Sequence, residues 1–396
     1  MDITIQPRTL RGEITVIPSK SQAHRLLICA AFADAPTVLV CPESNRDMDA
    51  TAGCLNALGA KITRTEEGYT VLPAQEIPGK AELPVHDSGS TLRFLLPVAG
   101  ALGVDATFKM EGRLPQRPLS PMWEEMERMG CTLSRPTADT IRCTGKLRPG
   151  HYRIDGSVSS QYITGLTLAL SLLDAPSQLE ITGRMESKPY IQLTKDAISL
   201  FGADPDRPGT RQFHSPGKLT VEGDWSNGAF FLAANALGSQ LNIYGLDPNS
   251  SQGDRAAAEL LPKLLEGTQV IDAVDIPDLV PILSIVAACC HGAEFTNIRR
   301  LRLKESDRVA SVIAMIEALG GRAKADENTL RVYGTGLTGG TVNSVNDHRI
   351  AMAAAIAATV CAEPVTILGA ECVQKSYPKF FEEYRRLGGN YEQYLR

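Results

Sequence analysis

The chain lacks the patterns that mark several common classes of protein. Its nine cysteines form no CxxC pair, and no cluster of residues has the spacing of a metal site. We find no GxxxxGK[ST] run, and we expect no GxGxxG run to follow a strand. These absences disfavour a bound metal, a Walker-type nucleotide site and a dinucleotide cofactor.

The chain also has no block of like charges, no low-complexity tract and no apolar run long enough to span a membrane. Its net charge of -5 argues against nucleic-acid binding, which needs a basic surface. The most apolar windows, residues 279–290 and 350–362, are too short for a span and predict buried helices. No basic region followed by an apolar run opens the sequence, so we expect neither a signal peptide nor a transit peptide.

What is present describes a globular protein of 396 residues, with 43% hydrophobic and 21% charged residues. That length predicts about two domains. The cysteines are odd in number and mostly lie among apolar residues, so we expect reduced, buried thiols in a cytoplasmic protein.

A glycine recurs six times at the end of an amphipathic run, and a strand-like stretch follows it. Glycine just past a helix adopts the left-handed conformation at little cost, so each marks a helix C-terminus. The rhythm predicts an α/β (α+β) fold of six repeats, three per domain, although such junctions also arise by chance in mixed proteins. The six are Gly59, Gly130, Gly202, Gly267, Gly320 and Gly388.

Short polar segments precede most of the predicted helices. The first, Ser19 to Arg25, places two hydroxyls and two cations where a new helix offers free N–H groups and a positive dipole end. That geometry suits an anion, although a serine-capped helix with solvated cations explains the same letters. Similar segments occur elsewhere, and helix capping or solvated side chains would also explain each of them. They are residues 86–93, 112–118, 156–162, 186–190, 275–278, 304–308, 346–349 and 375–378.

Two carboxylates stand out in these segments. Asp278 lies just ahead of an apolar helix, and Glu305 lies beside Lys304. Carboxylates at such places are often only caps, and Asp307 fits that role better than Glu305. The whole set, cations with hydroxyls and two carboxylates, suits a small substrate carrying several negative charges.

Taken together and in order, the segments resemble the family of 5-enolpyruvylshikimate-3-phosphate synthases. The resemblance covers nearly the whole chain: SKSQAHR, DSGSTLR, LPQRP, GSVSSQY, SKPY, GDWSNGAFFLAA, IPD, LKESDR, NDHRIAM and QKSYP. It implies two domains, each of three βαβαββ-type units, with the chain crossing twice between them and the active site in the interdomain cleft. It also implies an enzyme of the shikimate pathway of aromatic amino acid biosynthesis, without metal or organic cofactor.

The family joins shikimate 3-phosphate to phosphoenolpyruvate and releases phosphate. The resemblance implies that shikimate 3-phosphate is held by Ser21, Arg25, Ser159, Ser160, Ser187, Tyr190 and Lys304. It implies that phosphoenolpyruvate is surrounded by Lys20, Arg117, Gln161, Arg308, Arg349 and Lys375, with the backbone at Gly89 close to it. Asp278 would deprotonate the 5-hydroxyl and Glu305 would handle the methylene proton, while Lys20 could share either duty.

The sequence departs from the familiar family pattern in places. Asp87 and Ser90 stand where asparagine and threonine are common, and Arg300 with Leu301 replaces an Asn-Trp pair. Asp87 adds negative charge near a bound anion, which would weaken binding unless a cation pairs with it. We expect glyphosate to compete here, because Gly89 keeps the necessary space.

Two other functions stay open at this stage. Transfer of enolpyruvate to a UDP-sugar would use the same fold, but that family has Lys-Asn at the first segment and a loop cysteine where this chain has Gln116-Arg117. A noncatalytic anion-binding paralogue is the other. We expect a monomer whose first domain comprises residues 1–14 with 224–396 and whose second comprises residues 15–223, with small-molecule substrates and neither nucleic acid nor membrane as partner.

Overall fold

The computed structural model describes residues 1–210 and 213–394 and divides into two compact units. Unit 1 comprises Met1–Ile17 and Gly223–Arg396, and unit 2 comprises Pro18–Glu222. Each unit has an apolar core of its own. Within the described ranges, no helix combines the length and the apolar character that crossing a membrane requires.

One arrangement of strands and helices recurs along the chain, and the stretch from β6 to β9 shows it completely. Strand β6 (Lys80–His86) pairs in parallel with β7 (Asp105–Met110), and helix α3 (Gly89–Leu102) connects them. Helix α4 (Met122–Arg128) then leads to the hairpin of β8 (Cys131–Ser134) and β9 (Thr140–Gly145). Strand β9 pairs antiparallel to β7, which gives the order β6-β7-β9-β8.

Three further sheets repeat this order of one parallel and two antiparallel pairs. They are β12 (Lys218–Thr220), β3 (Thr37–Val40), β5 (Gly68–Leu72), β4 (Lys61–Arg64); β14 (Gln269–Asp272), β15 (Ala293–Thr296), β17 (Thr329–Tyr333), β16 (Arg322–Ala325); and β18 (Gly340–Asn343), β19 (Val365–Leu368), β1 (Asp2–Gln6), β20 (Asn390–Tyr394).

Two shorter sheets keep only the parallel pair of the repeat. They are β10 (His151–Asp155) with β11 (Gln178–Thr182), and β13 (Gln240–Tyr244) with β2 (Arg11–Thr15). Counted over the described ranges, the six sheets make six repeats, three per unit, of which two lack the hairpin. The predicted α/β architecture of six repeats is confirmed.

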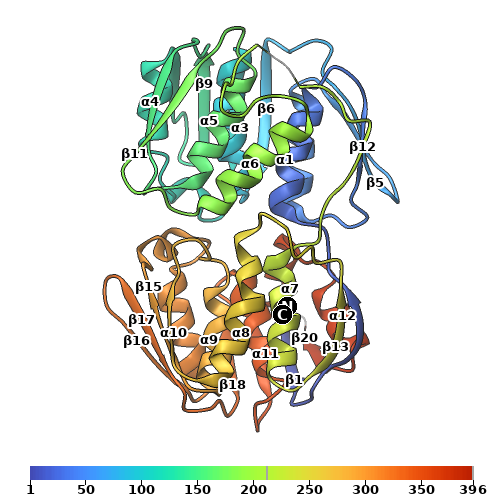
Figure 1. The fold of residues 1–396 in the computed structure, drawn as a ribbon, viewed down its shortest axis with the longest axis vertical. Helices are drawn as coiled ribbons and strands as arrows, with labels where there is room; N and C mark the ends of the chain where they lie inside the picture. Colours follow the sequence, from blue (N-terminus) through green and yellow to red (C-terminus); the bar gives the residue numbers. More distant parts are fainter. Residues whose placement is uncertain (211–212, 395–396) are drawn as a thin grey trace. The chain divides into compact units, whose positions relative to one another are not determined.

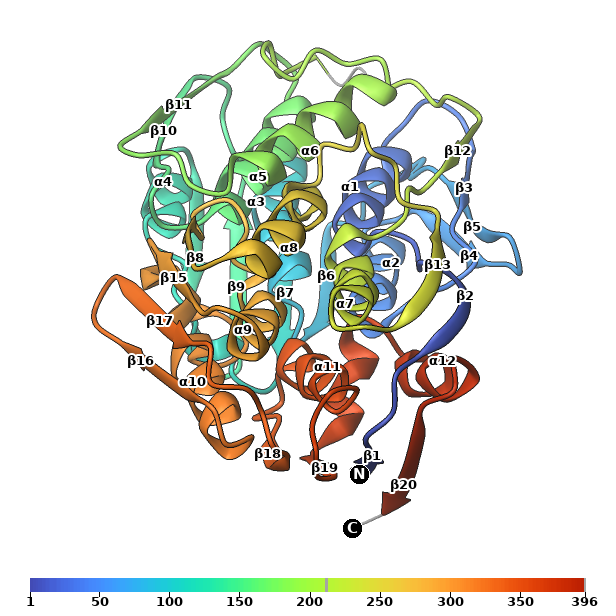
Figure 2. The same ribbon diagram turned by 60° about the horizontal axis from the view of Figure 1, so that its bottom comes forward.

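Two strands are exchanged where the chain passes from one unit to the other. Strand β2 precedes α1 (Lys20–Ala31) in the chain, yet it pairs with β13 of unit 1. Strand β12 precedes α7 (Trp225–Ala236), yet it pairs with β3 of unit 2. Strand β1 completes the sheet of the last repeat, because it pairs with β20. The first and last strands of the chain therefore lie side by side (Figure 2).

Helices fill the interior of each unit and the sheets lie on its outside (Figures 1 and 2). The first helix of each repeat is largely buried, because its apolar residues face packing partners on every side. These are α1, α3, α5 (Ser160–Ser171), α7, α9 (Val280–Cys289) and α11 (His348–Ala357). The second helices are α2 (Arg46–Ala57), α4, α6 (Lys188–Leu200), α8 (Ala257–Glu266), α10 (Arg308–Ala318) and α12 (Phe380–Arg386).

The six predicted glycines all follow these second helices. Five have the left-handed conformation, with φ between 73° at Gly202 and 118° at Gly130. Gly267 is the exception, because its φ of 172° is extended backbone that any residue can adopt. The prediction of a left-handed glycine is therefore wrong at this position, where Glu266 extends α8 up to the glycine.

Two smaller expectations need correction. Gly334 to Gly339 does match GxGxxG and follows a strand, but it connects β17 to β18 and opens no helix. All nine cysteines are free and seven are buried, whereas Cys289 and Cys290 at the end of α9 are partly exposed.

Candidate active site

Most of the polar segments found in the sequence lie at helix N-termini, and five of them precede the first helices α1, α3, α5, α9 and α11. In unit 2 the N-caps of α1, α3 and α5 are the neutral residues Ser19, Ser88 and Ser159, whose hydroxyls each accept a backbone N–H. In unit 1 the caps of α7 and α11 are Asp224 and Asp347. A neutral cap leaves the positive dipole end uncompensated, so the three helix starts of unit 2 favour an anion.

Lys20 opens α1 and forms an ion pair across unit 2. Its Nζ lies 2.9 Å from Oδ2 of Asp47, which belongs to the first turn of α2. Asp47 is 5% exposed and Lys20 14%, so the pair is largely shielded from water. The carboxylate therefore fixes the direction of the Lys20 ammonium group.

Arg25 is 2% exposed and holds three helices together. Its guanidinium donates to the hydroxyls of Thr194 and Thr164 at 2.9 and 3.2 Å, and to the carbonyls of Tyr190 and Ser21. Burial is the main influence on this group and lowers its pKa to about 10. Most of its donors are used within the protein, so its first effect is to fix α1 against α5 and α6.

Gly89, the first residue of α3, lies against two arginines. A Cβ atom at this position would come within 2.6 Å of Arg117 Nη1 and 2.8 Å of Arg93 Nη1. Arg93 donates to the Pro118 carbonyl at 3.1 Å, which anchors the loop that carries Arg117. Among the described residues, Nε of Arg117 is buried without a hydrogen-bond partner. A guanidinium in that condition suits an anionic ligand.

The remaining predicted residues of unit 2 lie at the starts of α5 and α6. Gln161 Nε2 donates to Ser90 Oγ at 3.0 Å, which links the first turns of α5 and α3, and Ser160 beside it is 4% exposed. Ser187 is 1% exposed and has a φ of 54°, in the left-handed region. That conformation costs a non-glycine residue about 1–3 kcal/mol and is concentrated at functional sites.

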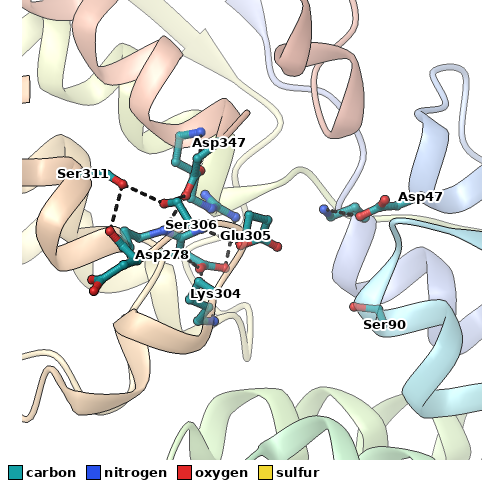
Figure 3. A network of polar contacts seen from close by, with 12 residues as sticks. Asp47, Ser90, Asp278, Lys304, Glu305, Ser306, Ser311 and Asp347 are labelled. Carbon is teal, nitrogen blue, oxygen red and sulfur yellow. Dashed lines mark hydrogen bonds and ion pairs between the residues drawn. The ribbon is translucent and has the colours of Figure 1, made fainter. Parts of the chain in front are cut away.

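Unit 1 contains a cluster of carboxylates around Arg308. Arg308 is 1% exposed and donates to three side chains: Asp278 at 2.7 Å, Glu305 at 2.8 Å and Asp347 at 3.1 Å. In Figure 3, Asp278, Glu305 and Asp347 lie close to one another. Ser306 also donates to Asp347 at 3.0 Å. The two predicted carboxylates are thus brought together by one buried cation.

Asp278 is surrounded by further cations. Arg349 lies 3.0 Å from its Oδ2, and Lys304 lies 3.5 Å from its Oδ1. Burial acts to raise the pKa of Asp278, but Arg349, Lys304 and Arg308 together lower it well below the usual range. Burial also lowers the pKa of Lys304. Asp278 is therefore a carboxylate at neutral pH.

The other predicted residues of unit 1 are close to these in the chain. Arg349 lies in the first turn of α11 and is 5% exposed, and Lys375 ends a 3-10 helix, Ala370–Lys375, and is 6% exposed. Asp307 caps α10 by accepting the N–H of Ala310 at 3.1 Å, as its sequence position predicts. The cluster thus combines an ionised base, a second carboxylate and several buried cations, which suits proton transfer on an anionic substrate.

Sequence reasoning missed Asp47, although its segment carries the same signal as the others. Asn45-Arg46-Asp47 is a polar group at the start of a helix, and Asn45 caps that helix. The partner of Asp47 lies 27 residues earlier in the chain, so the contact itself could not be read from spacing.

The fold is that of the enolpyruvyl transferases. It matches the EPSP synthase of Acinetobacter baumannii with a TM-score of 0.78 at 20% identity, over 99% of this chain and all of that one. It also matches the enolpyruvyl transferase NikO of Streptomyces tendae, with a TM-score of 0.76 at 16% identity over 99% and 98% of the two chains.

The sequence comparisons identify the family. The family model "EPSP synthase (3-phosphoshikimate 1-carboxyvinyltransferase)" matches residues 5–384. The 3-phosphoshikimate 1-carboxyvinyltransferase of Clostridium kluyveri is 37% identical over 99% of this chain and 98% of its own length, and that of a Clostridium botulinum strain is 36% identical over 98% of both. The chain belongs to the EPSP synthase family.

Proposed function

We propose that the chain transfers the enolpyruvyl group of phosphoenolpyruvate to the 5-hydroxyl of shikimate 3-phosphate and releases phosphate. Membership of the EPSP synthase family supports this reaction. The observation that carries the mechanism is Asp278, a carboxylate whose side chain is 16% exposed and which Arg308, Arg349 and Lys304 hold. It is a base placed among cations that can bind phosphate and carboxylate groups.

The proposed roles of the remaining residues follow from the charges of the two substrates. Each substrate carries a phosphate and a carboxylate, so several cations are needed to neutralise them. We assign shikimate 3-phosphate to Ser21, Arg25, Ser159, Ser160, Ser187, Tyr190 and Lys304. We assign phosphoenolpyruvate to Lys20, Gly89, Arg117, Gln161, Arg308, Arg349 and Lys375.

Substrate binding turns Asp278 from a weak base into a stronger one. Three cations lower its pKa in the protein alone. When Arg349 and Lys304 bind substrate anions, their attraction for Asp278 is shared with those anions, and its pKa rises. Arg308 stays with its carboxylates because it is 1% exposed. Asp278 therefore becomes a stronger base when the 5-hydroxyl group, which gives it a proton, is bound.

The chemistry then proceeds in two balanced steps. The 5-hydroxyl oxygen bonds to the central carbon of phosphoenolpyruvate, its proton passes to Asp278, and Glu305 gives a proton to the methylene carbon. In the second step the bond to phosphate breaks, the proton held by Asp278 passes to the departing phosphate, and Glu305 takes a proton back from the methyl group to form the enol ether. Lys20, fixed by Asp47, stabilises the departing phosphate.

Substrate choice is tested by an acceptor panel. Phosphate release from phosphoenolpyruvate is measured alone and with shikimate 3-phosphate, shikimate or UDP-N-acetylglucosamine. We expect release with shikimate 3-phosphate only. Release with the UDP-sugar would show the sister activity, and binding of phosphoenolpyruvate without release in any mixture would show a noncatalytic anion-binding protein.

We further propose that the protein works as a monomer in the cytoplasm. The nine free thiols fit a reducing compartment, and each unit is stabilised by its own core. Light scattering coupled to size-exclusion chromatography should give a mass near 42.7 kDa. A mass twice as large would overturn the monomer.

A further inference from the structure

A chain of hydrogen-bonded side chains runs through the interior of unit 2, and the mechanism above does not use it. His24 Nδ1 lies 2.7 Å from Thr51 Oγ1, which in turn lies 2.7 Å from Thr91 Oγ1. The hydroxyl of Thr91 then donates to Ser88 Oγ at 2.7 Å. Each of the four residues is at most 1% exposed, so the protein shields the whole chain from water.

The chain passes through three helices and ends where the third one begins. His24 belongs to α1 and Thr51 to α2. Thr91 lies in the first turn of α3, and Ser88 is the N-cap of that helix. Gly89, which we assign to phosphoenolpyruvate, follows Ser88 directly. The last hydroxyl of the chain therefore lies next to a residue of the proposed substrate site.

The direction of these hydrogen bonds follows from the number of hydrogens, because a hydroxyl has only one to donate. Thr91 gives its hydrogen to Ser88, since the contact between them is oriented with Thr91 as the donor. The carbonyl of Asp47 is a poorer acceptor for this hydrogen, because it lies 3.4 Å away. Thr51 must then be the donor to Thr91, and His24 must donate to Thr51 through a hydrogen on Nδ1.

Ser88 is left with one hydrogen to donate. A serine hydroxyl has two acceptor positions and one hydrogen. In Ser88 the acceptor positions are filled by the hydroxyl of Thr91 at 2.7 Å and by the backbone N–H of Thr91 at 3.3 Å. Over residues 1–210 and 213–394, no atom accepts the remaining hydrogen. A buried donor in this condition is rare in a folded protein unless another molecule accepts its hydrogen.

A second buried donor without an acceptor lies at the same helix start. Among the described residues, Nε of Arg117 has no hydrogen-bond partner. Nη1 of the same guanidinium would lie 2.6 Å from a Cβ atom at Gly89. The first N–H groups and the dipole of α3 also favour negative charge at this end of the helix. The donors at Ser88 and Arg117 thus suit one acceptor, an anion beside Gly89.

We propose that Ser88 is a further binding residue for phosphoenolpyruvate: its hydroxyl donates a hydrogen bond to an anionic oxygen of the substrate beside Gly89. Thr91, Thr51 and His24 are positioning residues that fix the direction of this hydroxyl. Because the direction is set before the substrate arrives, less conformational freedom is lost on binding. The inference rests on the proposed function, because it takes phosphoenolpyruvate to be the anion bound there.

The first test needs no activity and determines the direction of the chain at its far end. Nitrogen NMR of protein labelled at the histidine ring nitrogens shows whether Nδ1 of His24 carries a hydrogen. The signals of His24 are those that disappear in His24→Asn. We expect a hydrogen on Nδ1. A bare Nδ1 would mean that the chain runs the other way, with Ser88 donating to Thr91, and would overturn the inference.

The second test compares Ser88→Ala with Ser88→Thr. Alanine removes both the donor and the helix cap, whereas threonine keeps both. For Ser88→Ala we expect KM for phosphoenolpyruvate to rise about tenfold or more, as for the loss of a hydrogen bond to a charged group. KM for shikimate 3-phosphate should stay near wild type, and Ser88→Thr should restore most of the affinity.

Two results of this comparison would overturn the inference. A role as a cap alone would lower the Tm of Ser88→Ala and leave both KM values unchanged. An equal rise of KM for phosphoenolpyruvate in Ser88→Thr would show that packing matters at this position and the hydroxyl does not.

Thr91→Val tests the positioning role, because it removes the hydroxyl that holds Ser88 and keeps the shape of the side chain. KM for phosphoenolpyruvate should rise severalfold. Ser88→Ala should add less in this background than in wild type, because Thr91 acts through Ser88. Thr37→Val is the matched control, since its buried hydroxyl contacts Ser215 at 2.7 Å and belongs to strand β3. Additive effects of Thr91→Val and Ser88→Ala would overturn the positioning role.

Failure of the proposed function would look different. Calorimetry measures the binding of phosphoenolpyruvate without any acceptor, and its Kd should rise about tenfold or more in Ser88→Ala even if no acceptor releases phosphate. An unchanged Kd in Ser88→Ala, in a protein that does release phosphate with shikimate 3-phosphate, would overturn the inference and leave the function standing.

Discussion

Arg308 donates to Asp278 at 2.7 Å from a position that is 1% exposed, so a buried cation compensates the charge of this carboxylate. The arginine is fully surrounded by protein and serves three carboxylates. It cannot move to a substrate without leaving them uncompensated. We propose that Arg308 stays with its carboxylates as a fixed charge and meets phosphoenolpyruvate in place, whereas Arg349 and Lys304 can turn toward a substrate.

Loss of Arg308 should destabilise the protein strongly. Arg308→Leu leaves Asp278, Glu305 and Asp347 close together without their common cation, and breaking a buried ion pair costs about 3–5 kcal/mol. Chemical denaturation should show a loss of this size. Arg299→Ala is the matched control, because its ion pair with Glu327 is exposed and should contribute less than about 1 kcal/mol.

The ion pairs of Asp278 should also make stability fall in acid. Its folded pKa lies well below 3.8, so its contribution is fully present above that pH and is lost as pH falls through the folded value. Asp278→Asn should therefore be less stable than wild type at pH 6, and the difference should shrink as the pH falls toward 2.5. The measurement is the free energy of unfolding as a function of pH. A difference that stays constant would show that the charge of Asp278 does not stabilise the fold.

Gly89→Ala should weaken phosphoenolpyruvate binding while the fold persists. The new Cβ would lie 2.6 Å from Arg117 Nη1, so the guanidinium must shift, and a shift of that kind should raise KM for phosphoenolpyruvate about tenfold. Gly53→Ala in α2 is the control, because nothing lies within 4 Å of its added Cβ. Inhibition by glyphosate should weaken in the Gly89 variant, and unchanged inhibition would contradict its competition at this position.

Asp47→Ala should lower activity although Asp47 touches no substrate in our account. The carboxylate directs the Lys20 ammonium group from 2.9 Å, and a lysine without that partner loses its fixed direction. We expect kcat to fall about tenfold or more, together with a loss of thermal stability, because the largely shielded Lys20 loses its counter-ion. Asp49→Ala, an exposed acid on the same helix, should leave kcat near the wild-type value.

The sequence allowed the repeat and the polar segments at helix starts to be predicted, because both depend on local chemistry. The end of a helix at a glycine and its start at a polar cluster can each be predicted from a few neighbouring residues. The pairing of β2 with β13 and of β12 with β3 could not be predicted, because the paired strands lie about 230 and about 180 residues apart in the sequence. The same limit hid Asp47, whose significance comes from a contact made only in the folded chain.

The most direct test of the account is phosphate release with both substrates saturating, measured for wild type, Asp278→Asn, Glu305→Gln and Asp307→Asn. Asp307 is the matched control, because it is a partly exposed helix cap in the same segment and asparagine caps equally well. We predict that kcat falls about 10²- to 10⁴-fold for Asp278→Asn and Glu305→Gln and stays near wild type for Asp307→Asn. Near-normal turnover in Asp278→Asn, with the protein folded, would contradict the central claim that this carboxylate takes the proton.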